Sequence, residues 1–220
     1  MRLYLASTSP ARLATLRAAG VEPAGLISPG VDEDAAVATI SAELGRPLSA
    51  SETVYELARL KAEAVVGQLV DGEPIDGFIL GGDSAFELDG TIYGKPHTAS
   101  IARERWQRMV GRTGVLHSGH WLIDHRAGSV HEGISCAGIG AVEDASVEFA
   151  ADITPAEIDA YIGTGEPLSV AGAFTVDSRG QAFIRRIEGN PSTVIGLSVP
   201  TLRTLLRDGF GVDWHELWNR

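Results

Sequence analysis

The first twenty residues join a short apolar strand directly to the start of a helix, and this junction limits the chain to folds that mix helices with strands. Residues 3–6, Leu-Tyr-Leu-Ala, are typical of a buried strand. Ser9 then provides an N-cap, Pro10 suits the first helical turn and Gly20 ends the helix. We therefore expect an α/β protein whose first helix N-terminus lies at the end of a strand.

The rest of the chain also alternates between helical and strand periodicity of its apolar residues, without a fixed repeat. Apolar spacing predicts a helix over 52–69, another over 98–110 with Ile101, Trp106 and Met109 inward, and a last one over 197–206. A capping box at Thr154 predicts a further helix. Strands are predicted at 78–80, 91–93, in an antiparallel set over 115–149, and around 174 and 183–184, whereas 35–51 is expected to be mainly loop.

Charge and composition narrow the classes of function. The 220 residues include 18 basic and 29 acidic side chains, a net charge of −11, and 44% hydrophobic residues, so we expect one folded domain over residues 1–220. The acidic balance disfavours nucleic-acid binding. The longest stretch without Asp, Glu, Lys or Arg, 189–202, contains two prolines and is too short to cross a membrane. The single cysteine, Cys136, cannot form an internal disulfide, and a cytoplasmic location is expected.

Two basic residues are candidates for binding an anion. Arg12 follows the helix start, where Ser7 and free backbone N–H groups could also meet a phosphate. Equally, Ser9 could simply cap the helix while Arg12 is solvated. Lys61 lies on or beside the apolar stripe of the 52–69 helix, so its ammonium must reach solvent or meet an anion, and removing its charge would relieve desolvation.

Two carboxylates and a third cation complete the set of candidates. Asp83 follows a buried strand and two glycines, at a strand end where ligands often bind, although it could only cap a turn. Glu33 lies in the acidic turn 32–34 and could form a carboxylate pair with it or remain a surface charge. Lys95 lies in a rigid Gly-Lys-Pro turn. These residue types together suit a metal and a phosphorylated ligand.

Other motifs in the sequence are weak evidence for a cofactor, metal or catalytic site. Neither G-x-G segment, 138–140 or 163–165, completes a dinucleotide fingerprint, and no Walker A sequence is present. His117 and His120 are three residues apart on a predicted strand and should face opposite sides, which disfavours a metal pair. Cys136 has no nearby base.

In order along the chain, these short motifs resemble those of one known family, the Maf-like nucleoside triphosphate pyrophosphatases, also called septum formation inhibitor Maf proteins. The resemblance covers residues 3 to about 209. It is carried by the segments 5–12 (LASTSPAR), 31–33 (VDE), 57–62 (LARLKA), 82–84 (GDS), 94–96 (GKP), 161–167 (YIGTGEP), 171–172 (AG) and 190–197 (NPSTVIGL).

The resemblance implies an enzyme that hydrolyses a nucleoside triphosphate to the monophosphate and pyrophosphate with Mg²⁺ or Mn²⁺. It also implies a fold similar to inosine triphosphate pyrophosphatases, with two lobes, a mixed sheet and a central nucleotide cleft, in a possible homodimer. By the same resemblance Asp83 would accept a proton, and Ser7, Arg12, Glu33, Lys61 and Lys95 would bind triphosphate or metal. Which of Asp83 and Glu33 is the base and which the metal ligand stays open.

Three positions depart from the common family pattern: Ala11 replaces an arginine, Ser84 a threonine and Asp177 a glutamine. The resemblance associates these positions with base specificity, so the preferred base is open. Two alternatives to the pyrophosphatase are a nucleotide-binding regulator of cell division without turnover and a phosphatase that removes only the γ-phosphate. Retention of both Asp83 and Glu33 favours turnover, because a binder needs the cations but not both carboxylates.

Overall fold

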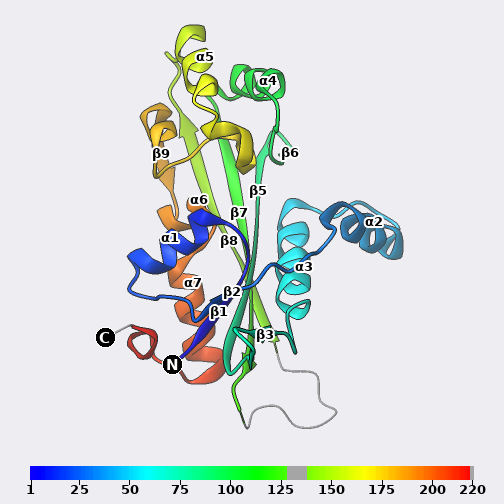
Figure 1. Cartoon of the computed structure of the whole chain (residues 1–220). Coiled ribbons are helices and arrows are strands. Elements are labelled where there is room, and N and C mark those ends of the chain that lie inside the picture. The colour runs from blue at the N-terminus through cyan, green and yellow to red at the C-terminus, as the bar shows by residue number, and fades with distance from the viewer. Residues whose placement is uncertain (128–137, 219–220) are drawn as a thin grey trace.

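The computed structural model describes residues 1–127 and 138–218, and a seven-stranded mixed sheet forms its centre (Figure 1). One strand runs parallel to its neighbours on both sides, and every other pair is antiparallel. The predicted α/β class is therefore confirmed, with a mixed sheet. In order across the sheet the strands are β2 (Gly25–Leu26), the parallel strand β1 (Leu3–Ala6), β5 (Gly77–Leu88), β7 (Thr113–His125), β8 (Gly138–Phe149) and β9 (Ile184–Glu188), and β6 (Thr91–Tyr93) pairs with β5.

Helices cover both faces of this sheet. They are α1 (Pro10–Ala18), α2 (Glu33–Leu44), α3 (Ala50–Glu63), α4 (Ala99–Met109), α5 (Pro155–Gly163), α6 (Pro191–Ile195) and α7 (Val199–Thr204). Short helical turns lie at η1 (Glu166–Ser169), η2 (Ala171–Ala173), η3 (Arg179–Phe183), η4 (Leu205–Gly209) and η5 (Trp214–Leu217), and β3 (Leu69–Val70) forms a small hairpin with β4 (Glu73–Pro74). None of the helices in the described part of the chain is long and apolar enough to cross a membrane.

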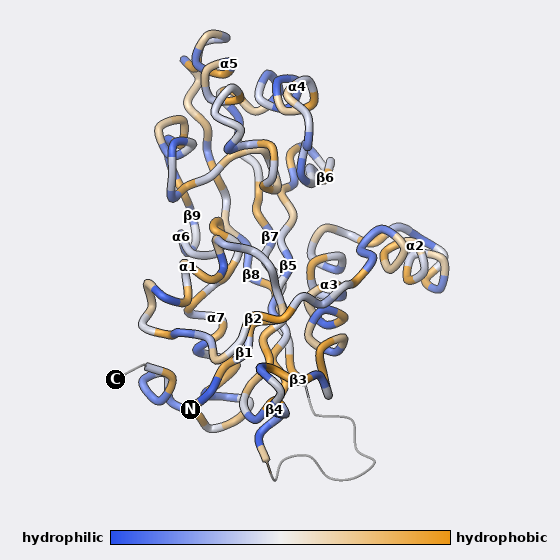
Figure 2. The backbone as a smooth tube through the Cα atoms, in the orientation of Figure 1, coloured by the Kyte–Doolittle hydropathy of each residue, from blue (hydrophilic) through white to orange (hydrophobic). Residues whose placement is uncertain are grey.

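The hydrophobic core has a separate centre at each end of the long strands. At one end, buried side chains gather around Trp106 between α4, α5 and the sheet. At the other end, Leu80 faces α1 and α7 on one side of the sheet, and Ile79 faces α3 on the other. By contrast, α2 stands away from the sheet, mixes hydrophilic and hydrophobic residues (Figure 2) and buries none of them fully. Strands β5, β7 and β8 connect the two core regions.

One edge of β5 is left open midway along the strand. β1 pairs with β5 only as far as Gly81, and β6 pairs with it only from Phe86 onward. Between them no strand in the described part of the chain covers this edge. Asp83 and Ser84 lie in the gap, and because successive side chains of a strand alternate, they project from opposite faces of the sheet.

Two glycines let α3 approach the sheet closely. A Cβ built on Gly81 would lie 2.1 Å from the carbonyl oxygen of Ala58, and one on Gly119 would lie 2.1 Å from that of Val54. Only a residue without a side chain fits at such contacts. The close packing brings the buried face of α3, including Lys61, against β5 beside Asp83.

Several expectations about local structure were wrong. Residues 33–44 form helix α2 rather than a turn and loop, because Asp32 caps the helix and Gly45 ends it in the left-handed conformation. Ile101 is exposed on α4, whereas Trp106 and Met109 are buried as predicted. Residue 174 is in no strand, and the helix predicted over 197–206 begins at Val199, after a separate α6. Cys136 lies outside the described residues.

Candidate active site

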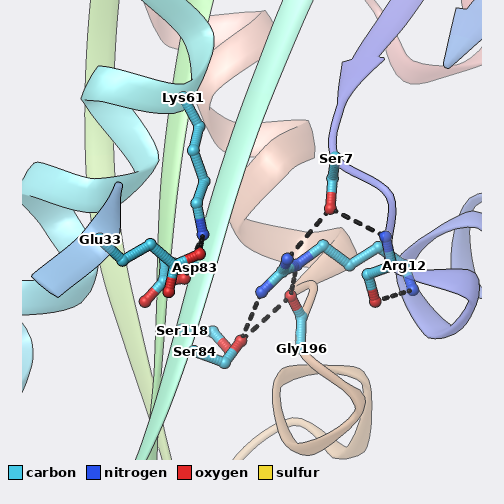
Figure 3. A network of polar contacts seen from close by, with 9 residues as sticks. Ser7, Arg12, Glu33, Lys61, Asp83, Ser84, Ser118 and Gly196 are labelled. Carbon is cyan, nitrogen blue, oxygen red and sulfur yellow. Dashed lines mark hydrogen bonds and ion pairs between the residues drawn. The ribbon is translucent and has the colours of Figure 1, made fainter. Parts of the chain in front are cut away.

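Lys61 lies between two carboxylates at the gap in β5. A capping box formed by Ser49 and Glu52 starts α3 and places Lys61 in its last turn, on the buried face. Its Nζ lies 2.6 Å from Asp83 Oδ1 and 2.6 Å from Glu33 Oε1. Of the two alternatives left open by the sequence, Lys61 thus meets an anion, and the protein itself supplies it (Figure 3). Only 7% of Lys61 is exposed, so its ammonium is held and not solvated.

Different surroundings push the pKa values of the two carboxyl groups apart. Burial raises the pKa of Asp83, and the charges of Lys61 and Arg12 oppose this rise without cancelling it. Burial also acts on Glu33, but less completely, since half of its side chain is exposed. There the hydrogen bond to Lys61 and the nearby positive charges outweigh burial, and the pKa of Glu33 is lowered.

Arg12 lies on the opposite face of β5, held by neutral oxygen atoms. Its Nε donates to the carbonyl of Gly196 (2.8 Å), its Nη1 to Ser7 Oγ (3.2 Å) and its Nη2 to Ser84 Oγ (3.0 Å). The Ser9 side chain accepts from the Arg12 backbone N–H, as predicted for an N-cap. Burial lowers the pKa of Arg12, yet a guanidinium stays protonated in proteins.

The Arg12 side of the site includes residues that the sequence analysis missed. Ser118 lies 3.2 Å from Ser84, Oγ to Oγ, and donates to the carbonyl of Thr193 (2.8 Å). Gly196, which supplies the acceptor for Arg12 Nε, has a left-handed φ of 109° at the end of α6. Strand alternation could have placed Ser118 beside Ser84, but the Arg12 to Gly196 contact joins positions 184 residues apart and has no local signal.

Lys95 approaches from the other end of the molecule, in the connection between β6 and α4. Its side chain is exposed, and its charge is one of those that lower the pKa of Glu33. Arg12 and Lys61 thus lie at the gap, from α1 and α3, and the charge of Lys95 acts on Glu33 from the connection between β6 and α4. Of the three positions associated with base specificity, Ser84 lies in the network and Ala11 precedes Arg12 on α1, whereas Asp177 lies exposed in the turn between η2 and η3.

The two histidines face opposite sides of β7, as predicted. His117 Nδ1 lies 2.7 Å from Asp144 Oδ1 on the α3 face. His120 is buried on the other face, where its Nε2 accepts from the backbone N–H of Ser198 (2.8 Å). Burial and the charge of Arg12 lower the pKa of His120 to about 4, so it is neutral near pH 7. They do not form a metal pair.

The carboxylates suit one class of metal ion. No group of three or more His, Cys, Asp or Glu side chains able to hold a metal occurs among residues 1–127 and 138–218. Mg²⁺, however, is commonly bound through one or two carboxylates with waters and substrate phosphates completing its shell. Glu33 and Asp83 each have a second carboxylate oxygen that takes no hydrogen bond from the described residues. This oxygen-only pair therefore fits Mg²⁺ or Mn²⁺ bound together with a phosphorylated ligand.

Comparison with known proteins identifies the family of the chain. Residues 2–209 match the family described as Maf-like protein. A nucleoside triphosphate pyrophosphatase of Leifsonia xyli subsp. xyli is 64% identical over 220 residues, covering all of this chain and 98% of that protein. Proteins of the same name from Salinispora tropica and Rhodococcus opacus are each 47% identical, covering 100% and 97% of this chain and 88% and 94% of their own. The chain belongs to the Maf-like protein family.

Proposed function

We propose that the protein is a nucleoside triphosphate pyrophosphatase, which hydrolyses a nucleoside triphosphate to the monophosphate and pyrophosphate. One observation carries the proposal: two carboxylates, Asp83 and Glu33, lie with the cation Lys61 at the open edge of β5, and Arg12 is held beside Ser84 in the same gap. The chain as a whole has a net charge of −11, so this local concentration of cations calls for an anionic ligand. The relatives are named for the same activity.

The cations on the open sides of the site would bind the triphosphate. The charge of Arg12 is not compensated by its direct partners, because they are neutral, and the edge of its guanidinium can meet phosphate oxygens. Ser7 lies beside it at the start of α1, where backbone N–H groups add donors. Lys95 would approach the phosphates from the side of α4, and Lys61 would approach them from α3.

The two carboxylates would have different roles. Asp83, whose pKa is raised by burial, suits the general base, since a base works best when its pKa is close to the working pH. Glu33, more exposed and with a lowered pKa, suits a metal ligand, and Asp83 would share that ion. A bound Mg²⁺ or Mn²⁺ would neutralise phosphate charge and orient the attacking water.

The chemical step is then an in-line displacement at the α-phosphorus. Asp83 takes a proton from water, the new oxygen to phosphorus bond forms, and the bond to the bridging oxygen breaks. Pyrophosphate leaves, and the proton on Asp83 returns to solvent. Lys61, 2.6 Å from Asp83, holds that carboxylate in place through the cycle.

The larger organisation follows from this proposal. We propose that residues 1–220 are one catalytic domain with two lobes, each containing one of the core regions, and that the nucleotide lies between them as in inosine triphosphate pyrophosphatases. The cytoplasmic location expected from the sequence and the possible homodimer implied by the resemblance remain predictions.

Product analysis tests the proposal directly. Purified protein with Mg²⁺ or Mn²⁺ should release pyrophosphate and a monophosphate from at least one triphosphate, and EDTA should abolish this. Asp83→Asn should lower kcat about 100-fold or more with an unchanged circular dichroism spectrum. Orthophosphate as the first product would indicate a γ-phosphatase, and nucleotide binding without turnover would indicate a regulator. Either result would overturn the proposal.

A further inference from the structure

The loop that carries Lys95 is fixed at several points. It connects Tyr93, the last residue of β6, to Thr98, the N-cap of α4. Pro96 is buried, and the backbone N–H of His97, which has a left-handed φ of 59°, donates to the carbonyl of Leu168 in η1 (3.0 Å). A loop held in this way presents its one charged side chain, Lys95, in a defined direction.

Arg105 holds the loop from the helix that follows it. Its guanidinium lies over the ring of Tyr93, 5.4 Å from the ring centroid, and its Nη1 donates to the carbonyl of Gly94. These contacts fix the residue directly before Lys95 and the last residue of the strand. An arginine can do both at once, because its planar head stacks on an aromatic ring while its edge donates hydrogen bonds.

Two other arginines on α4 form ion pairs with carboxylates instead. Arg103 forms an ion pair with Asp159 (2.7 Å), and Arg108 forms one with Glu104 (2.7 Å). Among the described residues Arg105 forms no ion pair with a carboxylate, and its hydrogen bond goes to the main chain beside Lys95. The guanidinium of Arg105 therefore binds a backbone carbonyl, whereas Arg103 and Arg108 bind carboxylates.

We propose that Arg105 is a positioning residue for the triphosphate site: it fixes Gly94 so that Lys95 projects toward Glu33 and the phosphates. This inference rests on the proposed function for the identity of the ligand. Arg105 does not itself contact the nucleotide. Its effect on binding passes through Lys95, the residue that follows the carbonyl it holds.

A double-mutant cycle on binding tests this coupling. The probe is a triphosphate with a methylene bridge between its α- and β-phosphates, titrated calorimetrically in the presence of Mg²⁺ into the wild type, Arg105→Met, Lys95→Ala and the double variant. Lys95→Ala should weaken binding about tenfold, the value of one charge-assisted contact. Arg105→Met should weaken it about three- to tenfold in the wild type. In the Lys95→Ala background the same substitution should change binding less than about twofold.

Two further variants separate positioning from general structure. Arg103→Met removes an arginine from the same helix and should bind the probe as the wild type does. Arg105→Lys keeps the charge and a donor and should recover part of the affinity. The inference is overturned if Arg105→Met binds normally, or if it weakens binding equally with and without Lys95. Because the probe is not hydrolysed, this result does not depend on pyrophosphate release, which tests the proposed function separately.

Discussion

The two faces of β5 present opposite charge balances within one site. On the α3 face, Lys61 contacts two carboxylates, so the cluster has one negative charge in excess when both are ionised. On the other face, Arg12 contacts two hydroxyls and a carbonyl, and its positive charge stays uncompensated by direct partners (Figure 3). The first arrangement attracts a cation and the second an anion. Under the proposed function, adjacent residues of one strand, Asp83 and Ser84, would therefore serve opposite halves of a metal-bound triphosphate.

The largest expected effect comes from removing the uncompensated cation. Arg12→Met should weaken binding of a non-hydrolysable triphosphate about 30- to 100-fold, because a guanidinium can make two charge-assisted contacts. Calorimetric titration measures this, with Arg17→Met, an exposed arginine of the same helix, as control. Near-normal binding by Arg12→Met would show that the α1 face does not hold the phosphates.

The next prediction concerns Lys61, and here the structure reverses an expectation from sequence. An unpaired lysine beside an apolar stripe would gain stability on replacement by Met. Lys61 is paired instead, so Lys61→Met leaves Asp83 buried without its cation and should lower the free energy of unfolding by about 1 to 3 kcal/mol. Added Mn²⁺ should restore part of this loss, because it replaces the missing charge. A melting temperature equal to or above that of the wild type would contradict the pairing.

Glu166 is a carboxylate held mainly by neutral donors, with one longer ion pair to Arg179 Nη1 (3.4 Å). Its side chain accepts hydrogen bonds from Tyr161, Thr175, Ser178 and Gly180, holding the turn that contains Asp177. Burial alone would raise its pKa, but these donors outweigh burial and lower the pKa to about 2. The stabilisation is therefore fully present above the unfolded pKa of about 4.3 and is lost as the pH falls from there toward 2.

Glu166→Gln should accordingly lower the free energy of unfolding by about 1 to 2 kcal/mol at pH 7, and the difference from the wild type should shrink below about pH 4. Urea unfolding at both pH values measures this. Glu188→Gln, at an exposed ion pair with Arg186, is the control and should change little. A difference that is constant with pH would mean that the charge of Glu166 contributes nothing to its contacts.

The smallest effect is expected at Ser84. In the structure it accepts from Arg12, so Ser84→Ala should raise KM about two- to fivefold, and by the same factor for every triphosphate. The resemblance instead associates this position, with Ala11 and Asp177, with the base. A panel of triphosphates measured on Ser84→Ala, Ala11→Arg and Asp177→Gln separates these interpretations. A changed order of substrates in Ser84→Ala would show that the serine contacts the base.

Sequence patterns predicted the parts of the site that depend on local structure. The N-cap at Ser9 follows from a capping residue placed before Pro10, and the position of Lys61 on α3 follows from helix periodicity. Asp83 was expected at the end of a strand, but β5 continues to Leu88, so Asp83 lies midway along it. Helix α2 was missed because its residues bury no face, so its apolar spacing is weak even though Asp32 and Gly45 cap it well. No pattern could show that Lys61 binds both carboxylates.

The remainder depends on tertiary contacts between distant segments. Gly196 accepts from Arg12 only because α6 packs beside α1, and Arg105 reaches Gly94 only because α4 folds back over β6. The open edge of β5 also arises from where β1 stops and β6 begins, which no single strand pattern specifies. The family resemblance had pointed to residues in several separate segments of the chain. The tertiary contacts explain how those segments come together.

The most direct test of the opposite charge balances is to measure each ligand alone. Mn²⁺ is titrated into nucleotide-free protein, and the non-hydrolysable triphosphate is titrated in EDTA, for Glu33→Gln and Arg12→Met. Glu33→Gln should weaken Mn²⁺ binding about tenfold or more and leave triphosphate binding unchanged or tighter, whereas Arg12→Met should do the reverse. If both variants lose both ligands to the same extent, the two faces of β5 do not divide the metal from the phosphates and the account is wrong.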